Sequence, residues 1–236
     1  MIYLKVESHS GCNVLSQIND VRKVCTDVMS SACPKASFRS LINTIKREFK
    51  AHSIELEIKT RLINKLDINE FYVNAYYDPE SDKNNECAIE VVIYHNIKSD
   101  SIFEHHQLGQ FMVQIYDAVV HEFRHRYQSR ARQFCNLVQP TDVSDTELYL
   151  ADPDEVDAYA VSIAIELIRN LGNSRAIRYL HKVSRLAKIR PKGLFASVTL
   201  YQYFRIFHNT DHYILRKLIK KVYLNLQTID PLDVFY

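Results

Sequence analysis

Two kinds of hydrophobic periodicity divide the chain, and they constrain its fold more than any other feature of the sequence. In residues 16–51, and again after residue 105, apolar side chains recur every three to four positions, which is the spacing of one helix face. Residues 54–62 alternate apolar and polar side chains, and residues 70–78 and 86–97 are rich in aromatic and β-branched side chains, as strands are. We therefore predict an α+β fold with N-terminal helices, a small antiparallel sheet and C-terminal helices.

Local patterns place the first elements within this plan. Two helices are expected at the start of the chain, and the turn-forming segment PESDKNN (79–85) predicts a hairpin between the second and third strands. After the sheet, helical spacing returns and runs directly into segment 121–125. The residues that carry the helical spacing are Ile18, Val21, Val24, Cys25 and Val28, then Phe38, Leu41, Ile42, Ile45 and Phe49, and then Leu108, Met112, Ile115 and Val119.

The composition is that of an ordinary globular chain. Of the 236 residues, 25% are charged and 47% are hydrophobic, and no repeat, low-complexity run or Pro/Gly/Ser linker interrupts them. We therefore expect a single domain over residues 1–236. The first residues lack the pattern of a signal peptide, and no apolar stretch approaches the roughly 20 residues that span a bilayer. The expected location is the cytoplasm, without membrane contact.

The segment HEFRH, residues 121–125, places two histidines four positions apart on the helix that follows the sheet. Residues at this spacing lie one turn above each other, so His121 and His125 can direct two imidazoles at one ion. Zinc accepts nitrogen ligands at about 2.0–2.1 Å and, in catalytic sites, binds three protein ligands and a water whose pKa falls to about 7. Glu122 is offset around the helix, so it is free to act as the general base toward that water.

A third ligand is expected from a later helix, and the segment DPDEVDAYAVSIAIELIRNLG (152–172) contains a candidate. Glu155 lies in the first turn of this helix, roughly thirty residues after the histidines. We predict Glu155 as the third ligand and Asp157 as its substitute, although acidic residues at a helix start most often stabilise the helix dipole from the surface. The helix itself is delimited by an expected N-cap, a proline in the first turn and a closing glycine, which are Asp152, Pro153 and Gly172.

The motif HEFRH, its extension to Gln128 (HEFRHRYQ) and the segment DEVDAYA (154–160) together resemble the zincin metallopeptidases whose third ligand is a glutamate. Over residues 90–170 the pattern is similar to ImmA/IrrE-type peptidases and to small bacterial and phage-encoded HExxHxxQ peptidases. The resemblance implies a zincin-like fold, Zn2+ bound by His121, His125 and Glu155, and Glu122 as general base. It also implies that the strand at residues 88–95 holds a protein or peptide substrate by strand addition. The expected function is zinc-dependent hydrolysis of peptide bonds.

The sequence departs from the family pattern at two positions. Arg124 is charged where many members have an uncharged residue, and on a helix it is expected on the outer face, away from the two histidines. Tyr159 stands four residues after Glu155, where thermolysin-like enzymes have an aspartate, so no residue is assigned to orient a ligand histidine. A group that stabilises the oxyanion is also needed. It is sought among Tyr201, Tyr203, His208, His212 and Tyr213.

Three alternatives stay open. A deformylase-like site would use Cys87 as a ligand, although the glycine expected before this cysteine is missing. A nucleic-acid- or protein-binding module without catalysis would use basic helix faces to contact phosphates. The formal charge of only +2 argues against a dedicated nucleic-acid binder. A scaffold without metal or activity is the third alternative. The basic clusters are Arg124, Arg126, Arg130 and Arg132 on the motif helix, and residues 185–193 and 216–221.

Overall fold

The computed structural model describes residues 11–31, 36–135, 145–186, 196–208 and 211–236. The chain opens with two helices, α1 (Gly11–Ser31) and α2 (Phe38–Ala51), as the sequence predicts. The residues that carry the helical spacing in both segments are buried in the core. Ser37 begins α2 because its hydroxyl accepts a hydrogen bond from the backbone amide of Ser40 at 3.3 Å.

Three strands form the sheet in the order β1-β3-β2, with bounds Glu57–Leu62 for β1, Phe71–Tyr77 for β2 and Ile89–His95 for β3. The predicted hairpin of β2 and β3 is confirmed, and its connection contains a short helix, α3 (Pro79–Lys83). However, β1 pairs with β3 in parallel, so the sheet is mixed and the prediction of an antiparallel sheet is wrong. Alternation along β1 shows which face is buried, but it does not specify the neighbouring strand or its direction.

The position of β3 also overturns the expectation that residues 88–95 hold a substrate by strand addition. β3 pairs with β1 on one side and with β2 on the other, so its backbone has no free edge for a further strand. β2 is an edge strand, and its outer edge lies beside the motif helix, α4 (His105–Ala131). There the side-chain oxygen of Gln114 accepts a hydrogen bond from the Val73 amide at 3.1 Å.

The C-terminal half is helical, and α6 (Pro153–Leu171) is its central element. The predicted limits of α6 are confirmed. The Asp152 carboxylate accepts a hydrogen bond from the Asp154 amide at 2.7 Å, and Gly172 ends the helix at a φ of 72°, which other residues rarely adopt. Contacts join α6 to α4 and to α5 (Thr146–Ala151), α7 (Asn173–Leu186), α8 (Val198–Phe207) and α9 (Tyr213–Thr228). A short 3-10 helix, Pro231–Asp233, follows α9.

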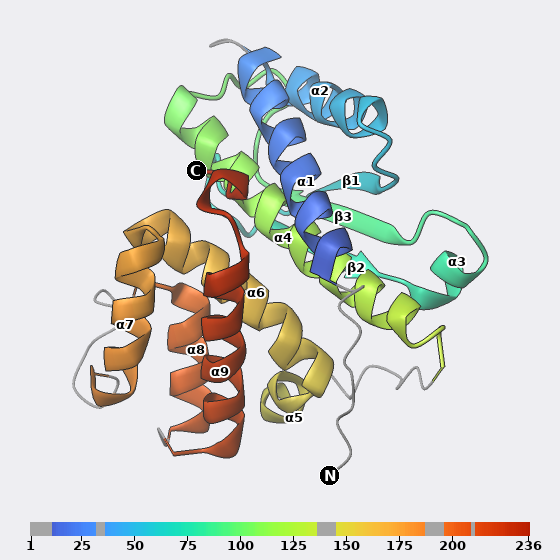
Figure 1. The fold of residues 1–236 in the computed structure, drawn as a ribbon. Helices are drawn as coiled ribbons and strands as arrows, with labels where there is room; N and C mark the ends of the chain where they lie inside the picture. Colours follow the sequence, from blue (N-terminus) through green and yellow to red (C-terminus); the bar gives the residue numbers. More distant parts are fainter. Residues whose placement is uncertain (1–10, 32–35, 136–144, 187–195, 209–210) are drawn as a thin grey trace.

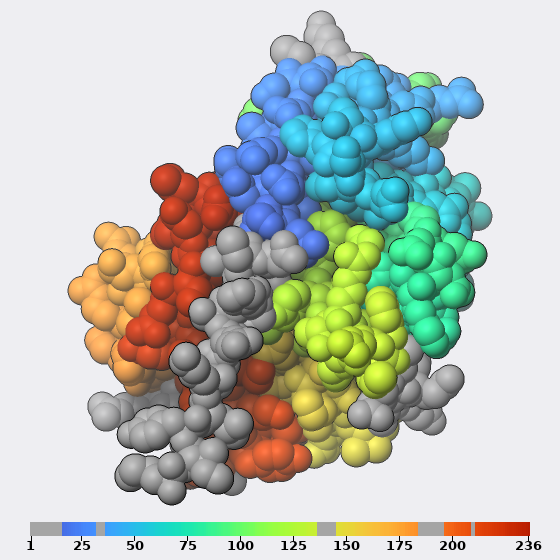
Figure 2. Space-filling model, turned by 45° about the vertical axis from the view of Figure 1, so that its right-hand side comes forward, coloured from blue at the N-terminus to red at the C-terminus, as the bar shows by residue number. Residues whose placement is uncertain are grey.

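α4 packs between two layers, the sheet on one side and α6 on the other (Figure 1). A hydrophobic cluster continues through all these layers, from α1 to the residues after α9. The last turns of α4 reach the molecular surface between the β2–β3 hairpin and the start of α6 (Figure 2). None of the described helices is long and apolar enough to cross a membrane.

Asp82, in α3, fastens the hairpin to α4. Its side chain is only 1% exposed, and it accepts hydrogen bonds from the Tyr77 hydroxyl at 3.0 Å, Arg126 at 3.0 Å and Arg130 at 2.8 Å. Burial raises the pKa of Asp82, but the two guanidinium groups and the tyrosine hydroxyl outweigh it and lower that pKa below its ordinary value. The ionised carboxylate is therefore the form that the fold stabilises.

We predict that Asp82→Asn lowers the free energy of unfolding by about 1–3 kcal/mol at neutral pH, because two arginines lose their anionic partner. Since folding lowers this pKa, the stabilisation is present above the unfolded-state value of about 3.9 and is lost as the pH falls through the folded-state value. Urea denaturation across this range measures the difference. Asp20→Asn, which breaks an exposed pair with Lys23, is the control and should change the stability by less than about 1 kcal/mol. Equal losses in both variants would contradict the role of Asp82.

Candidate metal centre

Three acceptor side chains converge where α4 meets α6. His121 and His125 project from successive turns of α4, and Glu155 projects from the first turn of α6. The two Nε2 atoms are 3.2 Å apart. Glu155 Oε2 is 3.5 Å from His121 Nε2, and Glu155 Oε1 is 3.4 Å from His125 Nε2. The structure thus brings together the three residues that the sequence predicts as ligands.

The spacing of these atoms fits a tetrahedral zinc ion. Donor atoms about 2.0–2.1 Å from such an ion lie roughly 3.3–3.5 Å from one another. The two Nε2 atoms, 3.2 Å apart, are close to this spacing, and each of them lies at a similar distance, 3.5 or 3.4 Å, from a different oxygen of the Glu155 carboxylate. In addition, Glu155 Oε2 is buried and has no hydrogen-bond partner among the described residues. A buried carboxylate oxygen without a donor is costly, and a cation at this point would satisfy it.

The three ligand candidates strongly affect one another's protonation. Burial raises the pKa of Glu155, but the two histidines outweigh it and lower that pKa to about 2, so the carboxylate is ionised. Burial lowers the pKa of His121 more than Glu155 raises it. For His125 the balance is reversed, and Glu155 raises its pKa against the effect of burial. The side chains of His121, His125 and Glu155 are 13%, 17% and 14% exposed, so the group lies at the boundary with solvent.

Glu122, the predicted general base, lies beside this group on the same turn of α4. Its side chain is almost completely buried. Burial and the negative charge of Glu155 raise the pKa of Glu122 to about 8, against the opposing effects of His125 and the Tyr77 amide. The Glu122 carboxyl therefore interacts electrostatically with His125 and Glu155 and with the Tyr77 amide at the end of β2.

Both histidines have a second polar contact on the ring nitrogen that faces away from the cluster, and the sequence did not identify either partner. His121 Nδ1 lies 3.4 Å from the Ser162 hydroxyl, about two helix turns beyond Glu155 on α6. His125 Nδ1 lies 3.0 Å from Gln128 Oε1. The Gln128 amide nitrogen in turn donates to the Asp157 carboxylate at 3.1 Å. Gln128 could have been identified from the sequence, since it completes the HEFRHRYQ pattern. No sequence pattern points to Ser162.

Asp157, the predicted substitute for Glu155, does not join the two histidines in the structure. Its carboxylate accepts hydrogen bonds from Arg124 on α4, from Lys221 on α9 and from Gln128. The candidate metal-binding group that contains His121 and His125 includes Glu155 and not Asp157. The expectation that Arg124 lies on the outer face of α4 is also wrong, because it turns toward α6 and forms an ion pair with this aspartate.

The remaining arginines of α4, and Arg132 at its C-cap, are paired as well. Arg126 and Arg130 bind Asp82, and Arg132 binds Asp154 at 3.0 Å. The basic cluster that suggests a phosphate-binding helix is therefore matched by carboxylates from α3 and α6. Of the other two basic segments, residues 187–193 lie outside the described residues. In residues 216–221, Lys221 is bound to Asp157, while Arg216, Lys217 and Lys220 are exposed.

Tyrosines surround Glu155, and only one comes from the segment in which the sequence suggested an oxyanion-stabilising group. Tyr203 is fully buried and packs against Tyr159, whose ring lies 4.5 Å from that of His121. Tyr149, on α5, was not predicted, yet burial, Tyr159 and Glu155 together raise its pKa far above the ordinary value. The other candidates are not assembled here. Tyr213 and His208 are exposed, Tyr201 lies elsewhere on α8, and His212 caps α9.

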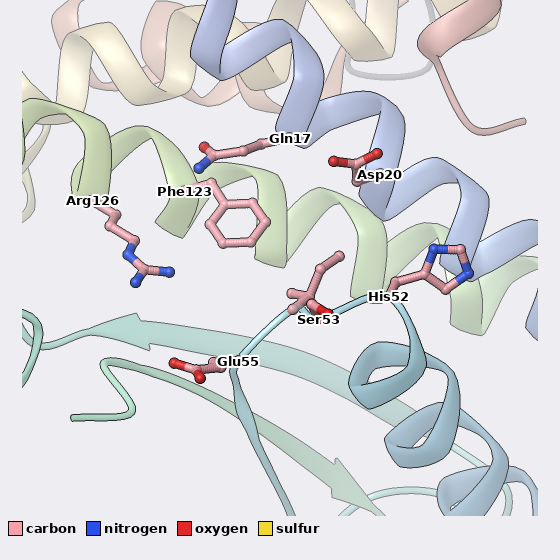
Figure 3. A pocket seen from close by; sticks show the side chains of 8 residues that line it. Gln17, Asp20, His52, Ser53, Glu55, Phe123 and Arg126 are labelled. Carbon is pink, nitrogen blue, oxygen red and sulfur yellow. The ribbon is translucent and has the colours of Figure 1, made fainter. Parts of the chain in front are cut away.

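A recess lies elsewhere, on the side of α4 that faces α1. It measures about 200 Å³ and is lined by Phe123 and Arg126 of α4 and by Gln17, Asp20 and residues 52–55 (Figure 3). A second group with metal-ligand chemistry, Asp27, Glu48 and His52, borders it, but the pair of Asp27 and His52 at 2.8 Å accounts for that contact. Cys87 is exposed and belongs to neither group, so the structure does not assemble a deformylase-like site.

Comparisons with protein-family models, with curated proteins and with solved structures find no significant match to this chain. The interpretation of the site therefore depends on its own geometry.

The hydroxyl of Tyr203 is buried and has no partner among the described residues, whereas the hydroxyl of Tyr116, equally buried, donates to the Asp233 carbonyl at 3.2 Å. We predict that Tyr203→Phe leaves the free energy of unfolding unchanged or raises it by up to about 1 kcal/mol, because an unsatisfied group is removed. Tyr116→Phe should lower it by about 1 kcal/mol. Chemical denaturation of the metal-free protein measures both. A large loss in Tyr203→Phe would show that its hydroxyl has a partner.

Proposed function

We propose that this protein is a zinc-dependent metallopeptidase with a zincin-like arrangement of its site. The observation that carries the proposal is the convergence of His121, His125 and Glu155 at separations suited to one zinc ion, with a buried carboxylate oxygen that makes no hydrogen bond to any of the described residues. Two nitrogens and one carboxylate are the ligand set of catalytic rather than structural zinc sites, since a fourth position stays open.

Each residue of the cluster has a separate role in this proposal. His121, His125 and Glu155 would hold the metal, which when bound supplies a Lewis acid that polarises a carbonyl and makes water acidic near neutral pH. In its ionised form, which a bound cation would favour although burial raises its pKa to about 8 in the metal-free site, Glu122 would take a proton from the attacking water and deliver it to the nitrogen of the leaving amine. Its burial beside the ligands keeps competing water away from the carboxyl group.

The substrate would be a protein or peptide that reaches the cluster from the solvent side of the α4–α6 junction. Because β3 is paired on both edges, an extended substrate cannot join the sheet there. The sheet has two edge strands, β1 and β2, and β2 is the candidate because it contacts α4 and ends at Tyr77, near Glu122. Gln114 already occupies the Val73 amide on this edge, so a substrate that pairs there would have to displace this side chain.

Metal analysis of the purified protein tests the site directly. We expect about one zinc per chain in the wild type and in Glu122→Gln, and loss of the metal in His121→Ala and Glu155→Ala, since each of these two removes a ligand. His52→Ala is the matched control, because it removes a histidine from the second His/Asp/Glu group. Wild-type protein without metal after exposure to zinc, or loss of zinc only in His52→Ala, would contradict the proposal.

Hydrolysis of a mixture of unstructured peptides, followed by mass spectrometry, tests the reaction. Glu122→Gln should lower the cleavage rate by at least about 100-fold while keeping the zinc content and stability of the wild type, because general-base catalysis contributes this much. Equal cleavage by the wild type and the variant would assign the activity to a contaminant or to another residue. Removal of zinc with a chelator should abolish cleavage, and added zinc should restore it.

A further inference from the structure

We infer that Gln128 is a positioning residue that fixes the tautomer of His125, with its own amide oriented by two acceptors, the Asp154 carbonyl and the Asp157 carboxylate. The inference rests on the proposed metal site and assigns a role to residues beyond its ligands. It is carried by a chain of hydrogen bonds that runs from the imidazole of His125 through one neutral amide to a carboxylate clamped by two cations.

The orientation of the Gln128 amide is determined by its partners. Its Nε2 atom lies 3.1 Å from the Asp154 carbonyl oxygen and 3.1 Å from Asp157 Oδ2. Both partners are acceptors only, so the group that faces them must be the NH2 group. The opposite end of the amide, Oε1, is therefore the atom 3.0 Å from His125 Nδ1.

This orientation selects one tautomer of His125. The amide oxygen of Gln128 has no hydrogen, so the bond forms only when His125 Nδ1 carries the proton and donates it. In a neutral ring, Nε2 is then the bare nitrogen, and it points toward Glu155 and His121. A metal-binding histidine needs this form, because the ligating nitrogen must present a lone pair.

Asp157 is held in place by charges from two helices. Arg124 and Gln128 reach it from α4, and Lys221 reaches it from α9. Two cations around one carboxylate leave it little freedom to turn away, even though its side chain is 14% exposed. Because the neutral amide stands between Asp157 and His125, the aspartate sets the direction of the hydrogen bond without placing a second negative charge on the imidazole. This arrangement gives Arg124 a role in the site without contact to the metal.

Two substitutions of Gln128 separate this role from a purely structural one. Gln128→Met keeps the length of the side chain but removes the acceptor. Gln128→Glu keeps an acceptor for His125 Nδ1 but loses the donor to Asp157 and adds repulsion. A purely structural role therefore predicts that the glutamate variant is the more damaged one, whereas the positioning role predicts that the methionine variant is.

The first readout is nitrogen NMR of the metal-free protein, at a pH where the His125 ring is neutral. The wild type and Gln128→Glu should show His125 with the proton on Nδ1, and Gln128→Met should shift toward the Nε2-protonated form. The second readout is zinc affinity by competition with a coloured chelator. Gln128→Met should bind zinc roughly 10- to 100-fold more weakly, and Gln128→Glu within a few-fold of the wild type. Gln114→Met, which removes a side-chain acceptor from the same helix beside β2, should change neither.

The outcomes distinguish this inference from the proposed function. An unchanged tautomer in Gln128→Met overturns the inference, whatever the zinc affinity, and so does a tautomer change without a loss of affinity. An equal loss of affinity in both Gln128 variants also overturns it. If the wild type binds no zinc, the proposed function fails, while the tautomer in the metal-free protein still decides whether Gln128 orients His125.

Discussion

The rest of the structure depends on the burial of α4 on two opposite faces. Phe123 and its neighbours pack on the side of α1 and the sheet, while His121 and His125 face α6. A helix enclosed in this way cannot rotate without exposing one apolar face, so the directions of its polar side chains are fixed by the packing of its apolar ones. The same constraint places Glu122 at the boundary between the two faces, where it is buried yet adjacent to both histidines.

Two aspartates, the buried Asp82 and the half-buried Asp157, complete this packing with charge. Asp82 joins α3 to α4, and Asp157 joins α4, α6 and α9. Removing such carboxylates from water is costly, and that cost is offset only when several donors surround them, as they do here. These carboxylates favour one packing register of the helices, because only that register brings each donor to its acceptor. In α6 this register is also the one that places Glu155 opposite the two histidines.

Local patterns in the sequence predicted many of the helices and the candidate metal-binding residues. Contacts between residues far apart in the sequence could not be predicted from such patterns. The limits of α6 follow from Asp152 and Gly172, and the ligand trio follows from a spacing of four residues and one later glutamate. The parallel pairing of β1 was missed because alternation does not encode a partner. The short helices α3 and α5, of 5 and 6 residues, contain too few turns to show a period. The partners of Asp157 are separated from it by 29 to 64 residues, and no local pattern reports such contacts.

The arginines of α4 show why charge in a sequence is an uncertain guide to function. Four of them within nine residues suggest a surface for phosphates, and this is the strongest argument for a nucleic-acid-binding helix. In the structure each one meets a carboxylate of the same chain, and Asp82 alone accepts two. A phosphate would have to displace these carboxylates, which already supply charge-assisted hydrogen bonds in fixed geometry. The basic character of the helix is therefore used within the fold, where it holds the hairpin and α6 on either side of the histidines.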